Sequence, residues 1–491
     1  MALGAAAALL ILPGMHTPPG DVPALVAAAS PTEAFRPVTG AVFGDPTAPS
    51  NAILTALLDN IEHTPPGATI RIIGYSFSLG RVATALQDAY ARGVHVQVVM
   101  NGHSRQWAPA QRLAPLLGSD VTRRSFFVLT RGSARGPRGV THQKSWTFSQ
   151  VGRTRDIVMV GSMNLTGHGT EVQYSDAYVY TERPDVYAAY VELFDVQKLD
   201  TPVPAPYRTA GFPGGGAEFF PRPGTTQQAD PAALRISSLP SGADTRIRVS
   251  QFAWYGPRGT WLAEALAAQK RAGSSVVVVA GESVGSGVRR VLAEAGIPVH
   301  SGMYAHGKRI HTKLMLASYV DDTGTHTAIW TGSDNWSQQS FRNDDVVARV
   351  QDDRVAYRRY LQFFTFLAHP VAATGTPAAL PAPVTVPAPP RSATRVTARM
   401  VRHRVHRHGR GVIAGTVRPE YAGRRVLVQR HRAGTPGWRT VARSAPLSGS
   451  ESYRVRVPTG RTGLWRYRAV VRATVTGTSA WSATVSLRVL P

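Results

Sequence analysis

The chain has 491 residues with 43% hydrophobic content, which predicts several globular domains, and it has no cysteine, which excludes disulfides, a cysteine nucleophile and cysteine-zinc sites. The formal net charge is +25, but residues 391–491 hold 21 Arg, no Lys and only two acidic residues, so +19 of that charge lies at the C-terminal end. A region this basic predicts affinity for a polyanion, such as an anionic membrane, a cell-wall polymer or nucleic acid.

Residues 1–30 have the pattern of a signal peptide. An apolar run over residues 2–12 is followed by small residues that end at Ala29 and Ser30, as at a signal cleavage site. The run is too short to cross a bilayer as a helix. We therefore expect a secreted, extracellular protein.

Residues 38–200 alternate between helical and strand patterns, which predicts a first α/β half. β-α-β units of this kind imply a parallel sheet with right-handed crossovers. A loop at 132–139 is rich in Gly and Arg and is predicted to be flexible, and Arg131, Arg135 and Arg138 either recruit an anionic substrate or simply lie in a solvated loop. The expected helices are 51–62, 80–91, 109–117 and 184–197, and the expected strands are 68–77, 94–100, 125–129 and 157–162.

Residues 217–369 repeat this plan after a linker predicted at 201–216, which is rich in Pro and Gly. The strand pattern at 245–249 corresponds to that at 69–73, and the buried run at 272–279 corresponds to that at 92–99. An apolar helix is expected at 355–367. The fold class is therefore α/β, with two similar halves over residues 38–369.

Residues 370–391 form a Pro/Ala tract that should act as a stiff spacer. Beyond it, residues 392–491 contain seven short alternating runs divided by turn residues, which favours an all-β sandwich of immunoglobulin type. Its expected core aromatics are Trp438, Trp465 and Trp481.

One pattern of polar residues occurs twice in the chain. In each copy a His-x-Lys triplet lies in a strand-like run, and Gly-Ser-x-Asn follows after a hairpin. Alternation along a strand puts the His and the Lys on the same face. The copies supply His142, Lys144, Ser162 and Asn164 in the first half and His311, Lys313, Ser333 and Asn335 in the second. Two such sets brought to one place can hold a phosphodiester and attack it without a metal or another cofactor.

Each of these residue types has a defined task at such a site. The lysines can neutralise the non-bridging oxygens, and the Ser hydroxyls and Asn amides can donate hydrogen bonds to them. One imidazole can attack phosphorus while the other protonates the leaving oxygen. A carboxylate behind each imidazole would fix its tautomer. Asp176 and Asp344 follow the two Gly-Ser-x-Asn runs and are the candidates, with Glu171 and Asp345 as alternates.

The paired motifs resemble those of the phospholipase D superfamily. This resemblance implies that the halves form one pseudo-symmetric catalytic unit, that the reaction passes through a phosphohistidine without a metal, and that His142 is the nucleophile and His311 the acid. The family motif also places an Asp five residues after each Lys, where this chain has Ser149 and Ser318. That difference questions the geometry of the hairpin more than the chemistry.

Three functions fit the sequence. The first is a secreted phospholipase D-like phosphodiesterase that cleaves or transfers phosphatidyl head groups. The second is a nuclease of the same superfamily, which would grip DNA or RNA with the basic C-terminal domain. The third is a non-catalytic surface protein that binds polyanions. Two motifs in one chain favour the first function and a monomer, whereas the basic C-terminal region favours the second.

Overall fold

The computed structural model describes residues 35–369 and, in the C-terminal part, residues 380, 382–385, 395–418, 425–432, 437–445, 447, 452–471 and 480–491. The signal-like segment 1–30 and most of the predicted 370–391 linker lie outside the described residues. Within the described residues, no helix is long and apolar enough to cross a bilayer.

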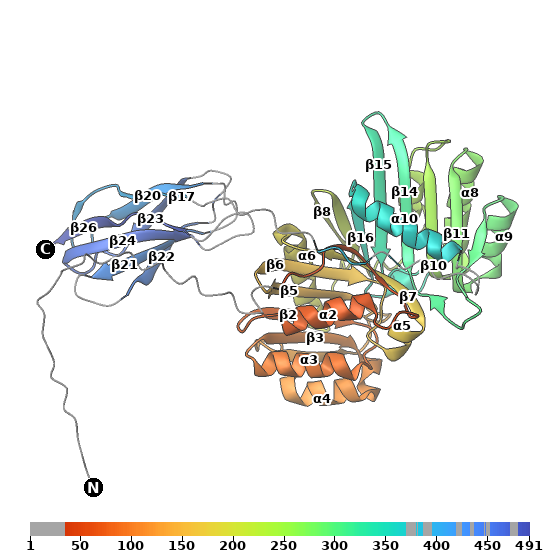
Figure 1. Cartoon of the computed structure of the whole chain (residues 1–491), viewed down its shortest axis with the longest axis horizontal. Coiled ribbons are helices and arrows are strands. Elements are labelled where there is room, and N and C mark those ends of the chain that lie inside the picture. The colour runs from red at the N-terminus through yellow and green to blue at the C-terminus, as the bar shows by residue number, and fades with distance from the viewer. Residues whose placement is uncertain are drawn as a thin grey trace, which may run out of the picture.

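The first half contains a mixed sheet with the strand order β1-β7-β6-β5-β2-β3-β4 (Figure 1). Strands β2, β3 and β4 are parallel, and the other neighbours within this order are antiparallel. The strands are β1 (Gly40–Gly44), β2 (Thr69–Gly74), β3 (His95–Asn101), β4 (Phe126–Thr130), β5 (Ser145–Val151), β6 (Thr154–Gly161) and β7 (Gln173–Tyr180). The helices are α2 (Ala52–Glu62), α3 (Gly80–Ala91), η1 (Gly102–Gln106), α4 (Ala108–Leu117), α5 (Gly167–Glu171) and α6 (Pro184–Gln197).

The second half contains a sheet with the order β12-β11-β10-β14-β15-β16-β9-β8. Its first seven strands follow the same plan as β4-β3-β2-β5-β6-β7-β1. The strands are β8 (Arg208–Phe212), β9 (Gly215–Phe219), β10 (Arg246–Trp254), β11 (Ser275–Val284), β12 (Val299–Ser301), β14 (Lys313–Asp321), β15 (Gly324–Gly332) and β16 (Val346–Gln351). The helices are η2 (Gln227–Ala229), α7 (Pro231–Ser237), α8 (Gly256–Arg271), α9 (Ser286–Glu294), η3 (Ser340–Arg342) and α10 (Arg354–Ala368).

The predicted linker at 201–216 is wrong over most of its length. Strands β8 and β9 form an antiparallel hairpin there, and β9 pairs with β16 at the edge of the second sheet. The glycines that looked like linker residues allow close pairing, since a Cβ at Gly215 would lie 2.1 Å from the carbonyl oxygen of Arg349.

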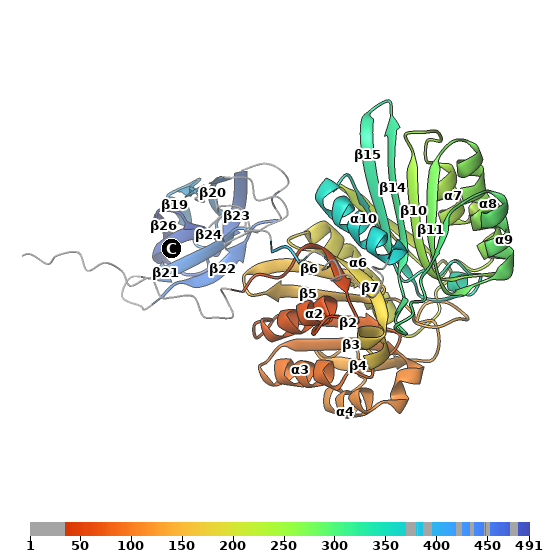
Figure 2. The same cartoon turned by 45° about the vertical axis from the view of Figure 1, so that its right-hand side comes forward.

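The helices and sheets of the two halves stack in layers, with three apolar cores between them. One core lies between α2, α3, α4 and the first sheet, and another lies between α7, α8, α9 and the second sheet (Figure 2). The third core fills the space between the two sheets, where α6 and α10 pack. Because α10 contacts strands of both sheets, the halves share one interior and hold each other in place.

Helix starts follow local capping chemistry. The side chain of Asn51 accepts from the backbone N–H of Leu54 at 3.3 Å, and Asp353 accepts from Ala356 at 2.9 Å. Asp230 caps α7, where Pro231 occupies the first turn. Each cap satisfies an amide that the helix itself leaves without a partner.

The C-terminal region is an all-β sandwich of two sheets. One contains β17, β18, β20 and β23, and the other has the order β19-β26-β24-β21-β22, with β25 paired to β24. Trp465 packs in the core as predicted, but Trp481 is 64% exposed, so its predicted core position is wrong. The strands are β17 (Arg395–Val396), β18 (Arg399–Met400), β19 (Arg404–His406), β20 (Gly411–Arg418), β21 (Leu427–Arg432), β22 (Arg439–Arg443), β23 (Ser452–Val457), β24 (Gly463–Val471), β25 (Ala480–Trp481) and β26 (Val485–Leu490).

Candidate active site

The two His-x-Lys segments lie at the starts of β5 and β14, where the two halves of the chain contact each other. The backbone N–H of His142 donates to the carbonyl oxygen of Asp344 at 3.0 Å, and that of His311 donates to Tyr174 at 2.8 Å. Just before His311, strand β13 (Arg309–Ile310) adds to β7 of the first sheet in parallel. Each histidine is therefore anchored by the backbone of the opposite half.

The imidazoles are also oriented across the interface. Nδ1 of His142 lies 2.7 Å from Oδ1 of Asp345 in the second half. Nδ1 of His311 lies 2.8 Å from the carbonyl oxygen of Ser162 in the first half. An acceptor at Nδ1 holds the proton on that nitrogen and leaves Nε2 of a neutral ring as the free base. The alternate Asp345, which the sequence ranked second, is thus the carboxylate at His142.

Asp344, the first candidate from the sequence, does not contact an imidazole through its side chain. Its carboxylate lies 3.2 Å from Nε of Arg135 and accepts from the hydroxyl of Ser133 at 2.8 Å. Because successive residues of an extended chain point to opposite sides, Asp345 faces His142 and Asp344 faces the 132–139 loop. The prediction is therefore wrong for Arg135, which is fully buried, whereas Arg131 and Arg138 are exposed.

Asp176 also differs from its predicted place. Its carboxylate accepts from the hydroxyls of Ser162 at 2.7 Å and Tyr360 at 3.2 Å and forms a short hydrogen bond with Thr331. Asp176 therefore acts on His311 only through Ser162, whose backbone carbonyl oxygen accepts a hydrogen bond from Nδ1 of His311. The alternate Glu171 is exposed, and its backbone carbonyl accepts from Lys308. Among the described residues, no carboxylate hydrogen-bonds to the ring of His311.

The Gly-Ser steps of the two motifs share one local geometry. A Cβ at Gly161 would lie 2.1 Å from the carbonyl oxygen of Asp176, and a Cβ at Gly332 would lie 2.1 Å from that of Val346. Only glycine allows so close an approach. The hydroxyl of Ser162 then reaches Asp176, and that of Ser333 reaches Asp345 at 2.6 Å. The serines thus position carboxylates in addition to any contact with substrate.

The two lysines of the motifs lie beside aromatic rings at equivalent places. Nζ of Lys144 is 5.5 Å from the ring centre of Tyr75, and Nζ of Lys313 is 4.9 Å from that of Phe252. Each ammonium also donates to the backbone carbonyl of its own motif histidine. Tyr75 directly follows β2, and Phe252 lies in the C-terminal part of the equivalent strand β10; neither was predicted from the sequence.

The motif asparagines keep unused polar atoms. The side-chain Oδ1 atoms of Asn164 and Asn335 are buried without a hydrogen-bond partner in the described part of the chain, and Oδ2 of Asp345 is in the same state. Buried polar atoms are rarely left unsatisfied in folded proteins. The two motifs therefore share one feature, a buried and unsatisfied amide oxygen at the same position of each half.

The pKa shifts show that two histidines and two lysines are buried together and act on one another. Burial, followed by the charges of Lys144 and Lys313, lowers the pKa of His142 well below its ordinary value. Burial, followed by the charges of Lys313 and Lys144, does the same to His311. Burial also lowers the pKa of each lysine. Each imidazole responds to both lysines, so the four side chains surround one space, and an anion bound there would oppose all four shifts.

Arg258 fixes the second Gly-Ser-x-Asn run. This buried side chain of α8 pairs with Asp230 at 3.1 Å and with Asp334 at 2.8 Å, and it donates to the carbonyl oxygen of Asn335 at 3.0 Å. In the first half, the place of Asp334 is taken by Met163, which packs in the apolar core. A buried pair of this kind is recognisable only in three dimensions, because its members are far apart in sequence.

A third histidine lies at the edge of the site. The ring of His103 is 4.2 Å from Tyr75 and 5.1 Å from Trp107 between ring centres, and its Nε2 lies 3.0 Å from the hydroxyl of Ser76. Tyr75 is in turn 5.0 Å from the ring of His142. With Phe252, these partly exposed rings form an aromatic rim, defined as Tyr75, His103, Trp107 and Phe252.

The serines that replace the family's Asp lie away from the imidazoles. The hydroxyl of Ser149, near the far end of β5, accepts from the backbone N–H of Thr69 at 2.8 Å. Ser318 in β14 forms a hydrogen bond with the side chain of Tyr357 of α10. Both serines therefore support the hairpins, and the substitution leaves the reacting groups untouched.

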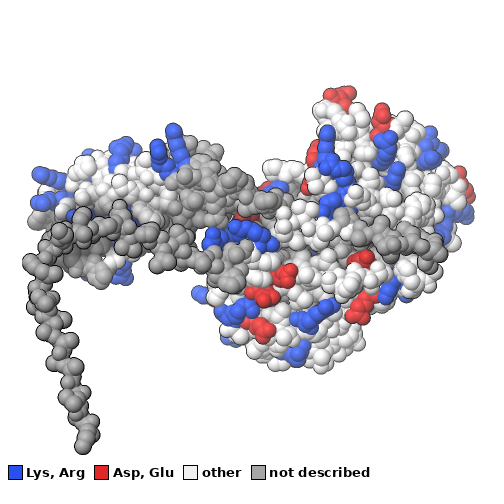
Figure 3. Space-filling view, viewed as in Figure 1, with Lys and Arg blue, Asp and Glu red and all other residues white. Residues whose placement is uncertain are grey.

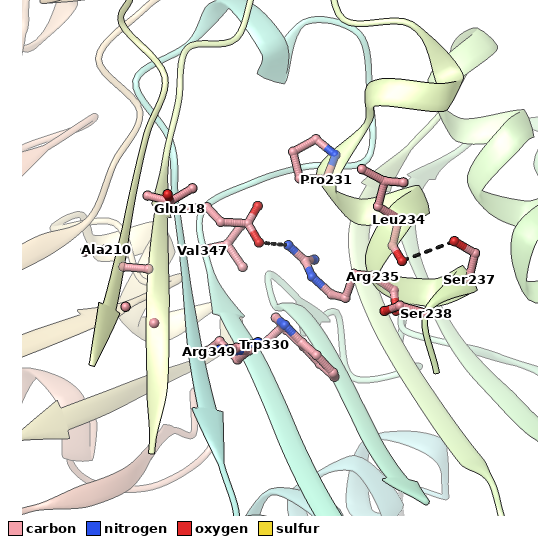
Figure 4. Close-up of a pocket in the computed structure, with 14 residues that line it drawn as sticks. Ala210, Glu218, Pro231, Leu234, Arg235, Ser237, Ser238, Trp330, Val347 and Arg349 are labelled. Atoms are coloured by element: carbon pink, nitrogen blue, oxygen red, sulfur yellow. Dashed lines mark hydrogen bonds and ion pairs between the residues drawn. The ribbon is translucent and has the colours of Figure 1, made fainter. Parts of the chain in front are cut away.

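A separate cavity of about 560 Å³ opens on the outer face of the second sheet (Figure 4). Arg235 of α7 reaches across it to Glu218 of β9 at 2.8 Å, beside Trp330 of β15. No residue of either motif lines this cavity. It is therefore distinct from the space around the imidazoles.

Comparison with known proteins finds one family model that matches part of the chain. Residues 57–197, which include the whole first motif, match the family model described as the phospholipase D-like domain of cardiolipin synthase. No curated protein matches the chain significantly.

Two solved structures also match the fold in part. A polyphosphate kinase from Porphyromonas gingivalis matches with 13% identity and a TM-score of 0.44 over 67% of this chain and 50% of its own, so this chain spans about half of that protein. A phospholipase D family member, Nuc from Salmonella typhimurium, matches with 19% identity and a TM-score of 0.24 over 31% of this chain and 88% of its own. The family match thus identifies a phospholipase D-like domain at residues 57–197, and the second half repeats its His-x-Lys and Gly-Ser-x-Asn pattern.

Proposed function

We propose that the protein is a secreted phosphodiesterase that cleaves phosphatidyl head groups, or transfers them to an alcohol, through a phosphohistidine at His142. The observation that carries the proposal is the difference between the imidazole partners. The acceptor at Nδ1 of His142 is the carboxylate of Asp345, whereas the acceptor at Nδ1 of His311 is a neutral carbonyl oxygen, and Nζ of Lys313 lies 3.3 Å from that same nitrogen. A ring that becomes a phosphorylated cation gains more from a carboxylate neighbour than a ring that only shuttles a proton.

The reaction then proceeds in two displacements. Nε2 of His142 attacks phosphorus, the P–N bond forms, and the bond to the head-group oxygen breaks as His311 gives that oxygen its proton. Water or an alcohol next attacks phosphorus and passes its proton to His311, which releases His142 and a phosphatidyl product. Lys144 and Lys313 offset the charge on the non-bridging oxygens, and Asn164 and Asn335 donate hydrogen bonds to them. Since these cations supply the charge, no step requires a metal.

A lipid substrate is supported by the aromatic rim. The partly exposed side chains next to the reacting groups are Tyr75, His103, Trp107 and Phe252, and Tyr255 is 44% exposed at the same end of the second sheet. Aromatic side chains at an opening suit the region where a head group joins its acyl chains. The signal-like pattern of residues 1–30 supports export. The one feature that favours the second candidate, a nuclease, is the +19 charge of residues 391–491.

A direct comparison of substrates tests this proposal. The purified protein is assayed on phosphatidylcholine vesicles, plasmid DNA and bis(p-nitrophenyl) phosphate, with and without EDTA, and the His142→Ala variant serves as the blank. Release of choline that survives EDTA and is lost in His142→Ala is the expected result. Nicking of plasmid without choline release assigns the nuclease function instead. Loss of all activity on chelation contradicts the metal-free route.

A further inference from the structure

The sheet that contains β24 has an outer face that no other element of the described chain covers. Along β24, Trp465, Tyr467 and Ala469 point into the core, so that Leu464, Arg466, Arg468 and Val470 point outward. On the neighbouring β26, Leu487 and Val489 point inward and Arg488 is exposed. The period of two thus separates an apolar inner face from a basic outer face.

Strand register brings four arginines of this outer face together. Arg404 of β19 lies opposite Arg488 of β26, which lies opposite Leu464 of β24. Arg466 and Arg468 follow along β24, where they lie beside His431 and Gln429 of β21. Neighbouring strands are about 4.8 Å apart and alternate residues about 7 Å apart along a strand. Arg404, Arg466, Arg468 and Arg488, which we call the arginine band, therefore spread over one plane.

Tryptophans occupy one end of the arginine band. The guanidinium of Arg468 lies 4.5 Å from the ring centre of Trp438 and 5.7 Å from that of Trp481, and its Nε donates to Gln429 at 2.9 Å. Trp481 is 64% exposed and Leu464, at the other end of β24, is 48% exposed. Burial of this exposed indole and leucine against a partner would be favourable, because it removes apolar surface from water.

We propose that this face docks on an anionic phospholipid bilayer. A bilayer offers a plane of phosphates that all four guanidinium groups can meet at once, and Arg suits phosphate because its planar fork donates two parallel hydrogen bonds. Below the phosphates, the bilayer offers an interface that Trp favours and an apolar layer that accepts Leu. A single polymer strand would satisfy the cations but would leave Leu464 or Trp481 in water, because these two side chains lie at opposite ends of β24.

Charge balance points in the same direction. Residues 391–491 contain 21 Arg against Glu420 and Glu451, both of which lie outside the described residues. Basic side chains stand out at several separate places on the visible described surface of this domain (Figure 3). This inference rests on the proposed function, because docking would bring the catalytic halves to a surface made of phosphatidyl head groups.

The second sheet of the sandwich offers a matched control. On β23, Arg454 and Arg456 are exposed on an outer face, just as Arg466 and Arg488 are on the first. The experiment compares the full-length variants Arg466→Gln/Arg488→Gln and Arg454→Gln/Arg456→Gln, which lose the same charge. Binding is measured by flotation with vesicles of phosphatidylcholine alone and of phosphatidylcholine with phosphatidylglycerol, and thermal melts check that each variant is folded.

The expected result is binding only to the vesicles that contain phosphatidylglycerol, with a roughly 10- to 30-fold loss in Arg466→Gln/Arg488→Gln, since each basic residue at an anionic surface contributes about a factor of five. The control pair should lose no more than about threefold, and Trp481→Ala should lose a further severalfold. Equal loss in both pairs would overturn the proposal, because it would mean diffuse attraction. Tighter binding to a single-stranded oligonucleotide, with the same dependence on Arg466 and Arg488, would also overturn it.

Turnover of bis(p-nitrophenyl) phosphate separates this proposal from the proposed function. This soluble diester needs only the catalytic halves, so both double variants should turn it over at the wild-type rate. A protein that floats with vesicles but cleaves no diester contradicts the proposed function and leaves the docking face supported. A protein that cleaves the diester but does not float contradicts docking alone.

Discussion

The two histidines occupy the same place in two sheets of the same strand order, yet their surroundings differ. At His142 the Nδ1 acceptor is the Asp345 carboxylate, while at His311 it is the carbonyl oxygen of Ser162. The hydrogen bonds of the backbone explain the difference. The backbone N–H of His142 donates to Asp344, which is followed by Asp345 in the second half. The backbone N–H of His311 donates to Tyr174, which is followed by Ser175 in the first half. Under the proposed function, this one difference in residue type would separate the nucleophile from the acid.

This comparison teaches that a repeated scaffold does not imply repeated chemistry. The Gly-Ser steps and the lysines lie at corresponding places in the two halves, whereas the groups behind the imidazoles differ. Under the proposed function, the shared groups would bind one anion, and the unlike groups would suit one ring to a covalent phosphoryl group and the other to proton transfer.

The largest effect should come from replacing each histidine and comparing two substrates whose leaving groups differ. His142→Ala should lose at least about 10⁴-fold of activity on every diester, because no nucleophile remains. His311→Ala should be as poor on phosphatidylcholine but should still release a burst of one p-nitrophenol per enzyme from bis(p-nitrophenyl) phosphate, since that leaving group needs no acid. The burst is read by stopped flow. A burst in His142→Ala and none in His311→Ala would reverse the assignment.

The next effect concerns the carboxylate itself. Asp345→Asn keeps the size of the side chain but removes its charge, so turnover should fall roughly 10²–10⁴-fold. Ser175→Ala changes the corresponding residue in the first half, whose hydroxyl is buried without a partner in the described chain, and should change turnover by less than about threefold. Steady-state rates and thermal melts of both variants are compared. Equal losses of activity would mean that the imidazoles are equivalent.

A third prediction concerns the support of the two motif loops. Arg258→Met leaves Asp230 and Asp334 buried without a cation, which should lower the free energy of unfolding by about 3–5 kcal/mol. Met163→Leu, at the place of Asp334 in the first half, keeps an apolar side chain and should cost less than about 1.5 kcal/mol. Urea denaturation measures both values. A small loss for Arg258→Met would show that the buried ion pairs do not hold the loop.

The smallest effect is a shift along the pH axis. Burial and the charges of Lys313 and Lys144 lower the pKa of His311 in the free protein, so its acid form is lost at a lower pH than for an ordinary imidazole. A bound diester anion offsets those charges and raises the pKa. The alkaline limb of the kcat profile, which reports the complex, should therefore lie at higher pH than that of kcat/KM, which reports the free enzyme. Coincident limbs would contradict this role for the bound anion.

Much of this organisation could be predicted from sequence because it depends on local periodicity. The helices at 51–62, 80–91 and 184–197 and the buried strands next to them follow from apolar spacing, and the paired motifs identified the site. The β8–β9 hairpin was missed because its glycines resemble a linker, while its stability comes from pairing with β16. Trp481 was misplaced because residue type alone cannot say which face of a strand points outward.

The choice between Asp344 and Asp345 shows where sequence reasoning ends. The two are adjacent, equally acidic and equally distant from the motif, but alternation along an extended chain sends them to opposite sides. Only the register of β16 against β15, which pairs Val347 with Gly332, decides which of them faces His142. The same holds for Asp176, whose partners Thr331 and Tyr360 come from the other half of the chain.

The reciprocal anchoring of the histidines has a consequence for how the molecule can be divided. Each half presents a ring whose acceptor belongs to the other, so neither fragment contains a finished reaction centre. Cleavage of the chain near residues 201–206, ahead of β8, should give two pieces that are inert alone and regain turnover when mixed. Such a pair of fragments would be active only when the two are close together, as in a split-enzyme assay. If the halves separated, both rings would lose their Nδ1 acceptors, and activity would be lost with them.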